Sequence, residues 1–343
     1  MISLPVLHEP EAVPSGTTPA VAAPENATPW IGPHGKLMER LELHITYTCP
    51  ERCVFCSEEH RMQRYKPYQV TFGRVATVLR EQALRGVKNV HFTGGEPTIH
   101  ADFIRILRLA KKLGLRTSVG TIGTMLCRED FAKEALPFLD EALFSLHGPN
   151  AKVHDALAGR DGSFERVTRA ISTVLRLKPK FGAYVNSVLT RENAEFLPET
   201  AQLAEKLGAT LMVVSNLTPE GSGLDEYERL TVTLEQLADV LPRTAGAVSR
   251  LMLRFFGVPM CLLGAHRACS NDLHWDPRVT VEWASAPGKV LLDGFYNWAP
   301  DRKRVHVAAC DGCSQRGVCM GVFDRYAELF PTSALRPELE EKS

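Results

Sequence analysis

The sequence predicts an α/β fold: a partial (β/α)6 barrel of the TIM type, followed by a small α+β domain with a β-hairpin. Two observations support this prediction. Short apolar runs alternate six times with amphipathic stretches between residues 41 and 243. After about residue 245 this alternation stops, and two apolar runs flank a Pro-Gly turn. Alternation of this kind is typical of a parallel sheet wrapped by helices, and six units fit a partial barrel better than a closed barrel of eight.

The apolar runs are short enough for buried strands, whereas the stretches between them place apolar residues three and four apart, as amphipathic helices do. Thr71, Ser163 and Thr233 precede three of the helical stretches and are expected to cap them. The expected strands are residues 41–46, 87–92, 117–121, 142–145, 183–189 and 210–214.

The chain divides into three predicted parts. Residues 1–36 hold many Pro, Ala, Thr and Glu without apolar periodicity, so a disordered leader is expected, and a role as an arm that recognises a precursor stays open. Residues 37–245 form the predicted barrel, and residues 246–343 form the small domain. Within that domain, residues 279–292 read as the hairpin.

The composition limits the possible functions. Lys and Arg equal Asp and Glu at 40 each, so the formal net charge is zero, which argues against a nucleic-acid partner. The sequence has no apolar stretch of about 18 residues and no secretory signal, so we expect a cytoplasmic protein without a membrane span. Nine cysteines in such a chain indicate metal binding more than disulfides.

Three cysteines carry the first candidate site. Cys49, Cys53 and Cys56 form a CxxxCxxC pattern at the end of an apolar strand. Thiolates are the ligands of iron–sulfur clusters, so the triplet can hold three irons of a [4Fe-4S] cluster and leave the fourth open. Structural zinc is the alternative, but closed zinc sites use four ligands in paired spacings. The triplet therefore predicts a cluster with an open iron.

With this triplet and the segment 93–98, which reads Thr-Gly-Gly-Glu-Pro-Thr, the chain resembles the radical SAM superfamily. Weaker similarity continues at residues 145–148, 159–164 and 186–190, and the resemblance covers roughly residues 40–325. It implies that S-adenosylmethionine binds the open iron. It also implies that an electron from the reduced cluster breaks a C–S bond and releases a 5′-deoxyadenosyl radical. An electron donor such as flavodoxin or ferredoxin is implied as a partner.

Several residues are expected to bind the cofactor. Glycines lack Cβ and let the backbone approach a ligand, and Glu96 can accept a hydrogen bond from the methionine ammonium. For Thr121, Ser145 and Asn186 the alternative is an ordinary turn or cap hydrogen bond. His147 reads better as a structural histidine than as an acid–base group. The expected cofactor-binding residues are Phe55, Gly94, Gly95, Glu96, Pro97, Thr121, Ser145 and Asn186. The family often has Thr-Asn-Gly where this chain has Ile122 in the middle position, so a contact from that Asn side chain is lost.

The remaining cysteines predict a second metal site. Residues 310–319 read CxxCxxxxxC and resemble the core of the auxiliary-cluster domains called SPASM and twitch. A full SPASM domain has a cysteine four residues later, where this chain has Phe323, so one auxiliary [4Fe-4S] cluster is expected. Cys269 is the expected spare, although it can replace Cys261, and zinc is the alternative metal. The expected ligands are Cys261, Cys310, Cys313 and Cys319.

The leading hypothesis is a radical SAM enzyme that abstracts hydrogen from a substrate C–H bond, in the maturation of a ribosomally made peptide or another natural product. Two alternatives are open: an enzyme acting on a small molecule such as a sugar or an antibiotic intermediate, and a non-catalytic iron–sulfur carrier. Trp275, Trp283 and Trp298 lie between the cysteines of the second site, where hairpin packing is a better reading than a substrate pocket.

Overall fold

A computed structural model describes residues 31, 37–68, 70–286 and 289–339 of the chain. The prediction of a disordered leader at residues 1–36 therefore lies outside the described residues, apart from Ile31. The strands of the main sheet are β1 Arg40–Thr46, β2 Asn89–Gly94, β3 Arg116–Thr121, β4 Glu141–Ser145, β5 Gly182–Leu189, β6 Leu211–Asn216, β7 Met252–Phe256, β8 Arg278–Ala286 and β9 Lys289–Asn297.

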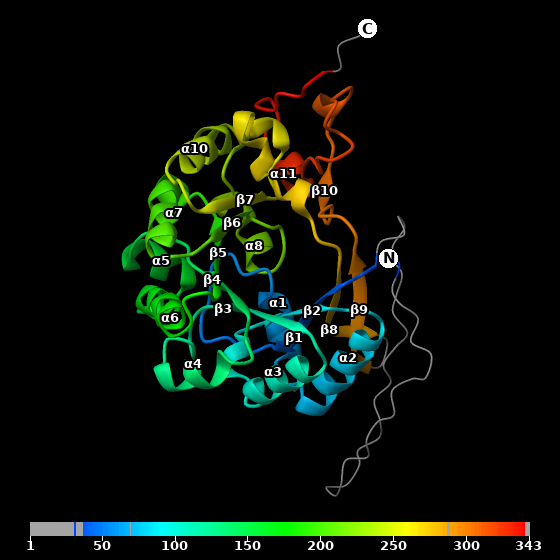
Figure 1. Cartoon of the computed structure of the whole chain (residues 1–343). Coiled ribbons are helices and arrows are strands. Elements are labelled where there is room, and N and C mark those ends of the chain that lie inside the picture. The colour runs from blue at the N-terminus through cyan, green and yellow to red at the C-terminus, as the bar shows by residue number, and fades with distance from the viewer. Residues whose placement is uncertain (1–30, 32–36, 69, 287–288, 340–343) are drawn as a thin grey trace, which may run out of the picture.

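These nine strands form one sheet in the order β7-β6-β5-β4-β3-β2-β1-β8-β9. All neighbouring pairs are parallel except β8 and β9, which form the antiparallel hairpin. The sheet curves with most helices on its outer side, and its two edge strands, β7 and β9, do not pair with each other (Figure 1). A partial barrel of the α/β class is thereby confirmed.

All six expected strands are present, with ends shifted by up to two residues. The structure adds β7, a seventh parallel strand that the sequence prediction missed. The hairpin was expected in a separate small domain, but β8 pairs with β1, so the hairpin extends the barrel sheet. The sheet therefore crosses residue 246, and the domain boundary placed there stays a prediction.

The helices lie between the strands and over the ends of the sheet. Their bounds are α1 Glu59–Tyr65, α2 Phe72–Leu84, α3 Phe103–Lys112, α4 Glu129–Ala135, α5 Ala151–Ala158, α6 Ser163–Leu177, α7 Leu197–Lys206, α8 Ser222–Asp225, α9 Tyr227–Leu230, α10 Leu234–Gly246 and α11 Asp324–Leu329. Short 3-10 helices are η1 Pro97–Ile99, η2 Ala194–Phe196, η3 Met260–Leu262, η4 Gly264–Cys269, η5 Asn271–His274 and η6 Ala308–Cys310. No helix among the described residues is long and apolar enough to cross a membrane.

Two of the three expected helix caps are present. Thr71 accepts a hydrogen bond from the Arg74 amide at the start of α2, and Thr233 forms a capping box with Gln236 at the start of α10. Ser163 is wrong as a cap, because Gly162 occupies that position and Ser163 is the first, fully buried residue of α6.

The carboxylate of Asp155, on the preceding helix α5, caps α6 in place of Ser163. It accepts hydrogen bonds from the amides of Gly162 (2.7 Å) and Phe164 (2.8 Å). Gly162 has φ of +74°, in the left-handed region that glycine adopts without a Cβ penalty. The side chain of Ser163 is therefore not needed for capping.

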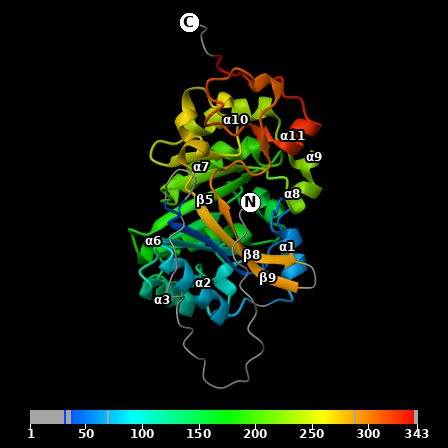
Figure 2. The same cartoon turned by 90° about the vertical axis from the view of Figure 1, so that its right-hand side faces the viewer.

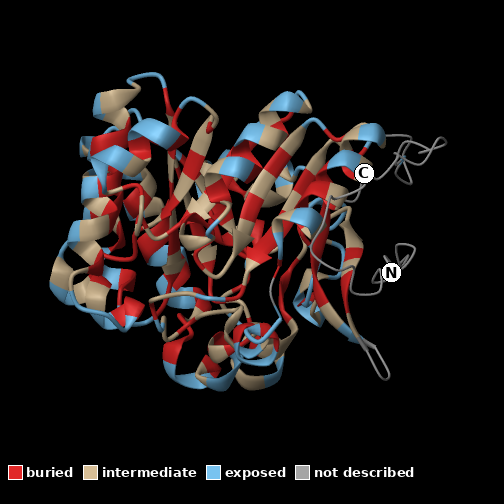
Figure 3. Ribbon diagram, turned by 90° about the horizontal axis from the view of Figure 1, so that it is seen from below, coloured by how far each residue is buried: buried red, intermediate tan, exposed pale blue. Residues whose placement is uncertain are grey.

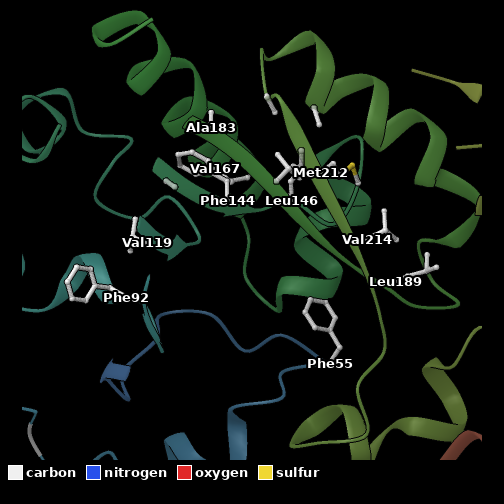
Figure 4. Close-up of a cluster of buried hydrophobic side chains, with 14 of the residues drawn as sticks. Phe55, Phe92, Val119, Phe144, Leu146, Val167, Ala183, Leu189, Met212 and Val214 are labelled. Carbon is white, nitrogen blue, oxygen red and sulfur yellow. The ribbon is translucent and has the colours of Figure 1, made fainter. Parts of the chain in front are cut away.

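Alternate strand residues face the helices and form the core. Phe144, Ala183, Met212 and Val214 lie with Val167 of α6 in one buried cluster (Figure 4). Exposed residues lie mainly on the outer surfaces of the helices (Figure 3). The other strand residues face the inside of the barrel, because successive side chains of a strand point to opposite faces.

A second, two-stranded antiparallel sheet pairs β10 Arg304–Val305 with β11 Val322–Phe323. Helix α11 follows β11 directly, and its Tyr326 hydroxyl accepts a hydrogen bond from the Leu234 amide at the start of α10 (2.9 Å). These elements lie at one end of the molecule, and α2 and α3 lie at the other (Figure 2). The C-terminal cysteines are therefore held against the end of the barrel that carries α10.

Candidate functional site

Cys49, Cys53 and Cys56 lie in the loop between β1 and α1, and all three are partly buried. Backbone hydrogen bonds hold this loop from two sides. The amides of Arg52 and Val54 donate to the last carbonyls of α5, each at 3.0 Å, and the Ser222 amide of α8 donates to the Cys56 carbonyl at 2.9 Å. The three thiols are therefore fixed by backbone contacts made far along the chain.

Two glycines permit these backbone contacts. Gly159 has φ of +62°, and a Cβ there would lie 2.4 Å from the Arg52 carbonyl oxygen. Gly221 has φ of +53°, and a Cβ there would lie 2.3 Å from the Cys56 carbonyl oxygen. Any other residue would strain the backbone and collide with the cysteine loop. Gly159 belongs to the weak similarity noted at residues 159–164. Gly221 was missed, because no sequence motif includes it.

Strand β8 supports the cysteine loop from a third side. The Tyr47 hydroxyl, two residues before Cys49, accepts a hydrogen bond from the Trp283 amide at 2.7 Å. Arg61 of α1 forms an ion pair with Glu282 of β8 at 2.9 Å. Trp283 thus packs in the core beside the loop, as the hairpin-packing interpretation expected.

Burial keeps the three thiols protonated in the metal-free chain. It raises the pKa of Cys49 and of Cys56 to about 12, and the pKa of Cys53 well above its ordinary value. The Glu51 carboxylate raises the pKa of Cys53 further. Since metals bind the thiolate, metal binding at this loop must release protons.

The Gly-Gly-Glu-Pro segment is joined to the residues just before Cys49. The Gly95 amide donates to the Thr46 carbonyl (2.8 Å), and the Glu96 amide donates to the Thr48 carbonyl (2.9 Å). A Cβ on Gly94 would lie 2.2 Å from the Thr46 oxygen, and a Cβ on Gly95 would lie 2.3 Å from the Thr48 oxygen. The glycines therefore allow close approach to the chain that leads into the cysteine loop, and their contact with a ligand stays a prediction.

Glu96 lies fully buried at the centre of a hydrogen-bond network. Its carboxylate accepts bonds from the Thr121 hydroxyl (2.7 Å), from the Ile122 amide (2.8 Å) and from Thr98. Burial raises its pKa, and these hydrogen bonds oppose the rise. Two of the expected cofactor residues, Glu96 and Thr121, thus contact each other. Because Ile122 contributes its backbone amide, the absence of Asn does not remove this bond.

Ser145 and Asn186 lie side by side on neighbouring strands β4 and β5. The Asn186 side chain accepts a hydrogen bond from Ser215 of β6 at 2.8 Å. Both are on the barrel face of the sheet, because their sequence neighbours Phe144, Leu146 and Val185 are buried in the core. Their position suits contact with a cofactor in the barrel, which stays a prediction.

Phe55, which belongs to the cysteine loop, packs against His147. Their rings meet edge to face, with centroids 4.7 Å apart, and Phe55 lies with the buried side chains of the sheet (Figure 4). His147 Nδ1 accepts the Val188 amide (3.2 Å), and burial lowers its pKa well below the ordinary value. A buried, neutral and hydrogen-bonded ring supports the structural interpretation of His147.

Four C-terminal cysteines line one cavity: Cys261, Cys310, Cys313 and Cys319. Cys269 is not among its lining residues. Burial raises the pKa of both Cys261 and Cys269, but their charged neighbours differ: the other three cysteines act on Cys261, whereas Arg254 acts on Cys269. The amides of Met260 and Gly321 point at the Cys319 sulfur at 3.5 and 3.4 Å. Spacing alone left Cys261 and Cys269 as alternatives, and this grouping favours Cys261.

A buried ion pair holds the Cys319 loop. Asp272 of η5 and Arg304 of β10 meet at 2.7 Å, and neither side chain is exposed to solvent. Asp272 also accepts the Met320 amide (3.0 Å), and Arg304 donates to the Gly321 carbonyl (2.7 Å). The pair thus bonds to both residues that follow Cys319. Sequence reasoning missed it because no local pattern links these residues.

Comparison with known proteins places the chain in a family. The model of the family described as the Radical SAM superfamily matches residues 43–204. The mycofactocin maturase MftC of Mycolicibacterium smegmatis is 32% identical over 306 residues, which cover 82% of this chain and 76% of that protein. The chain belongs to the radical SAM superfamily.

Two further comparisons define how far the likeness extends. The PqqA peptide cyclase of Rhodopseudomonas palustris is 32% identical over 215 residues, which cover 61% of this chain and 55% of that protein. The match thus spans about half the length of the cyclase. The structure of Streptococcus suis SuiB bound to S-adenosylmethionine has a TM-score of 0.58 at 16% identity, covering 88% of this chain and 79% of that one. This likeness shows the shared fold.

The radical SAM cofactors implied by the family fit the residues present. Three thiols on one loop supply ligands for three irons of a cluster. The buried network around Glu96 lies at the ends of the strands beside them, where α/β barrels place their active residues. These residues suit a metal cluster next to a polar ligand, and their binding to either stays a prediction.

Proposed function

We propose that this chain is a radical SAM enzyme that cleaves S-adenosylmethionine reductively and abstracts a hydrogen atom from a peptide substrate. One electron enters the sulfonium, the C–S bond breaks, and methionine and a 5′-deoxyadenosyl radical form. The radical then takes a hydrogen atom from a substrate C–H bond to give 5′-deoxyadenosine and a substrate radical. Cys49, Cys53 and Cys56 would hold a [4Fe-4S] cluster that would supply this electron, and a donor such as flavodoxin or ferredoxin would reduce it.

The observation that carries this proposal is the direct backbone linkage between the cysteine loop and the Gly-Gly-Glu-Pro segment. Cys49, Cys53 and Cys56 would hold three irons, leaving one open iron. Glu96 lies on the segment bonded to Thr48, next to Cys49 in sequence. In this arrangement the Glu96 carboxylate would accept a hydrogen bond from the ammonium group of S-adenosylmethionine, close to the open iron. Two of the relatives are a peptide cyclase and a maturase, which favours a peptide as substrate.

The C-terminal cavity supports a second, closed site. We assign Cys261, Cys310, Cys313 and Cys319 as the four ligands of an auxiliary [4Fe-4S] cluster, with Cys269 outside it. Two amides directed at the Cys319 sulfur suit a cluster, whose potential responds to hydrogen bonds on sulfur. With four protein ligands this site offers no open iron, so its role is electron transfer or shaping of the substrate site.

Anaerobic reconstitution tests both assignments. About eight irons per chain are expected for two cubane clusters, and about four irons with one zinc would contradict the auxiliary cluster. Reductant and S-adenosylmethionine should then yield 5′-deoxyadenosine. Cys53→Ala should abolish this product, and Cys127→Ala is the matched control, because Cys127 lies outside both cysteine groups and its thiol bonds to the Thr124 carbonyl. Cleavage that persists in Cys53→Ala would refute the mechanism.

A further inference from the structure

Four arginines of the main sheet lie on its barrel face. Arg40, Arg116 and Arg278 are the first residues of β1, β3 and β8, and Arg254 is the third residue of β7. The neighbours of Arg254 in sequence, Leu253 and Phe255, are buried in the hydrophobic core. Because side chains alternate along a strand, Arg254 points to the opposite, barrel face.

Arg254 differs from the other three in its partners. Arg40 pairs with Asp276 at 3.2 Å, Arg116 with Glu141 at 2.8 Å, and Arg278 with Glu42 at 3.2 Å. Arg254 donates to the carbonyl of its neighbour Leu253 at 2.9 Å. Within the described part of the chain, no carboxylate forms an ion pair with it. A partly buried guanidinium without a carboxylate partner can form charge-assisted hydrogen bonds with an added anion.

The register of the sheet places Arg254 at the level of the candidate cofactor site. Ser145 pairs with Asn186, Asn186 with Val213, and Val213 with Arg254, so the four residues form one row across β4 to β7. The paired arginines instead lie at the beginnings of their strands. Arg254 thus faces the part of the barrel where the reaction is proposed to occur.

An aromatic surface adjoins Arg254. Phe256, two residues on and on the same face of β7, stacks on Trp275 with ring centroids 6.4 Å apart. Trp275 is held by a hydrogen bond from its indole to the Asn297 carbonyl (3.2 Å) and by the Arg278 guanidinium 4.4 Å from its ring centroid. Trp275 thus contacts β7 at one edge of the sheet and β8 and β9 at the other edge, and its partners Phe256 and Arg278 are barrel-face residues. Trp275 therefore lies toward the barrel, unlike Trp283, which packs in the core.

We propose that Arg254 binds a carboxylate of the substrate inside the barrel, next to the Phe256–Trp275 surface. This inference rests on the proposed function and narrows it to substrates that carry an acidic side chain or a free C-terminal carboxylate. The planar guanidinium would bind the carboxylate through two parallel hydrogen bonds, while the aromatic pair contacts the apolar part of the same residue. Arg254 is then a residue that determines specificity.

Binding of two small probes tests the proposal on the reconstituted enzyme with oxidised clusters. N-acetylphenylalanine carries one carboxylate and one ring, and its amide replaces the carboxylate with a neutral carboxamide of similar shape. Dissociation constants come from ligand-observed NMR. We expect the wild type to bind the acid about tenfold more tightly than the amide, the size of one charge-assisted bond. Arg254→Gln should remove this preference, and Arg254→Lys should keep part of it, because the charge remains.

Arg116→Gln is the matched control, since Arg116 is also a barrel-face arginine but has an acid partner, and its preference for the acid should match the wild type. Equal binding of acid and amide by the wild type would overturn the proposal, as would loss of the preference in Arg116→Gln. The affinity for S-adenosylmethionine is measured in the same variants, because its methionine carboxylate is the competing ligand. A weakened affinity in Arg254→Gln would assign Arg254 to the cofactor instead. Failure to cleave S-adenosylmethionine in the wild type would refute the proposed function and leave the probe result standing.

Discussion

Removing one charge from the buried Asp272–Arg304 pair tests whether this ion pair keeps the Cys319 loop of the auxiliary site in place. Asp272→Asn keeps the shape of the side chain but leaves the Arg304 guanidinium buried without a counter-charge. Both side chains are fully buried, so solvent cannot compensate. Breaking a buried pair from one side costs about 3–5 kcal/mol, and the isosteric change should lie near the lower end, about 3 kcal/mol.

The lost free energy destabilises the loop that follows Cys319. The pair bonds the Met320 amide and the Gly321 carbonyl, so its loss frees the residues that follow Cys319. At about 1.4 kcal/mol per tenfold change, 3 kcal/mol raises the population of the opened loop by about two orders of magnitude. We therefore expect the iron content after reconstitution to fall from about eight to about four per chain, while the first site keeps its cluster.

The assay is iron and sulfide content together with urea unfolding of the metal-free chain. Glu328→Gln is the control, because Glu328 forms an exposed ion pair with Arg325 at 3.0 Å, and exposed pairs contribute about 0–1 kcal/mol. The control should keep about eight irons and the wild-type unfolding midpoint. If Asp272→Asn also keeps both, the buried pair does not hold the Cys319 loop and the reasoning fails.

Three further predictions concern the first site. Gly95→Ala should reduce iron to about four per chain, because its Cβ would lie 2.3 Å from the Thr48 oxygen; full loading would contradict the close approach. Thr121→Val should weaken S-adenosylmethionine binding about tenfold, measured by equilibrium dialysis, because the buried Glu96 carboxylate loses a hydrogen bond; an unchanged affinity would separate Glu96 from the cofactor. The metal-free chain should lose stability to urea as pH rises from about 9 toward 12, since the unfolded thiols ionise near 9 while the pKa of Cys49 and Cys56 is raised to about 12 in the fold. Cys49→Ser should flatten that pH dependence, and an equally steep curve in this variant would assign it to other groups.

Local patterns predicted the parts of the fold that local interactions determine. The six strands and the caps at Thr71 and Thr233 follow from periodicity and from side chains within three residues. The cap of α6 could not be predicted in this way, because Asp155 reaches it from the preceding helix. Strand β7 was missed because it has five residues and Arg254 interrupts its apolar run.

In the candidate site, too, local patterns could be predicted and contacts between distant residues could not. The cysteine triplet and the Gly-Gly-Glu-Pro segment are visible as spacings, so the residues around the first site could be proposed from the sequence. The contacts that arrange them join residues far apart, as Gly221 does with Cys56 and Asp272 with Arg304. The choice between Cys261 and Cys269 likewise depends on which thiol faces the C-terminal cavity, and spacing does not encode that direction.

The pairing of β8 with β1 has a consequence for how the protein is made. β1, which leads into the first cysteine loop, has β2 on one side and β8 on the other, and Arg40 lies opposite Arg278 in the strand register. While the ribosome is still producing residues 95–277, one edge of β1 has no strand to bond to. Such edges promote association between chains, and pairings this distant in sequence form slowly. Loading of the first cluster is therefore expected to follow synthesis of β8, and a chain that stops before residue 278 is expected to aggregate before it binds iron.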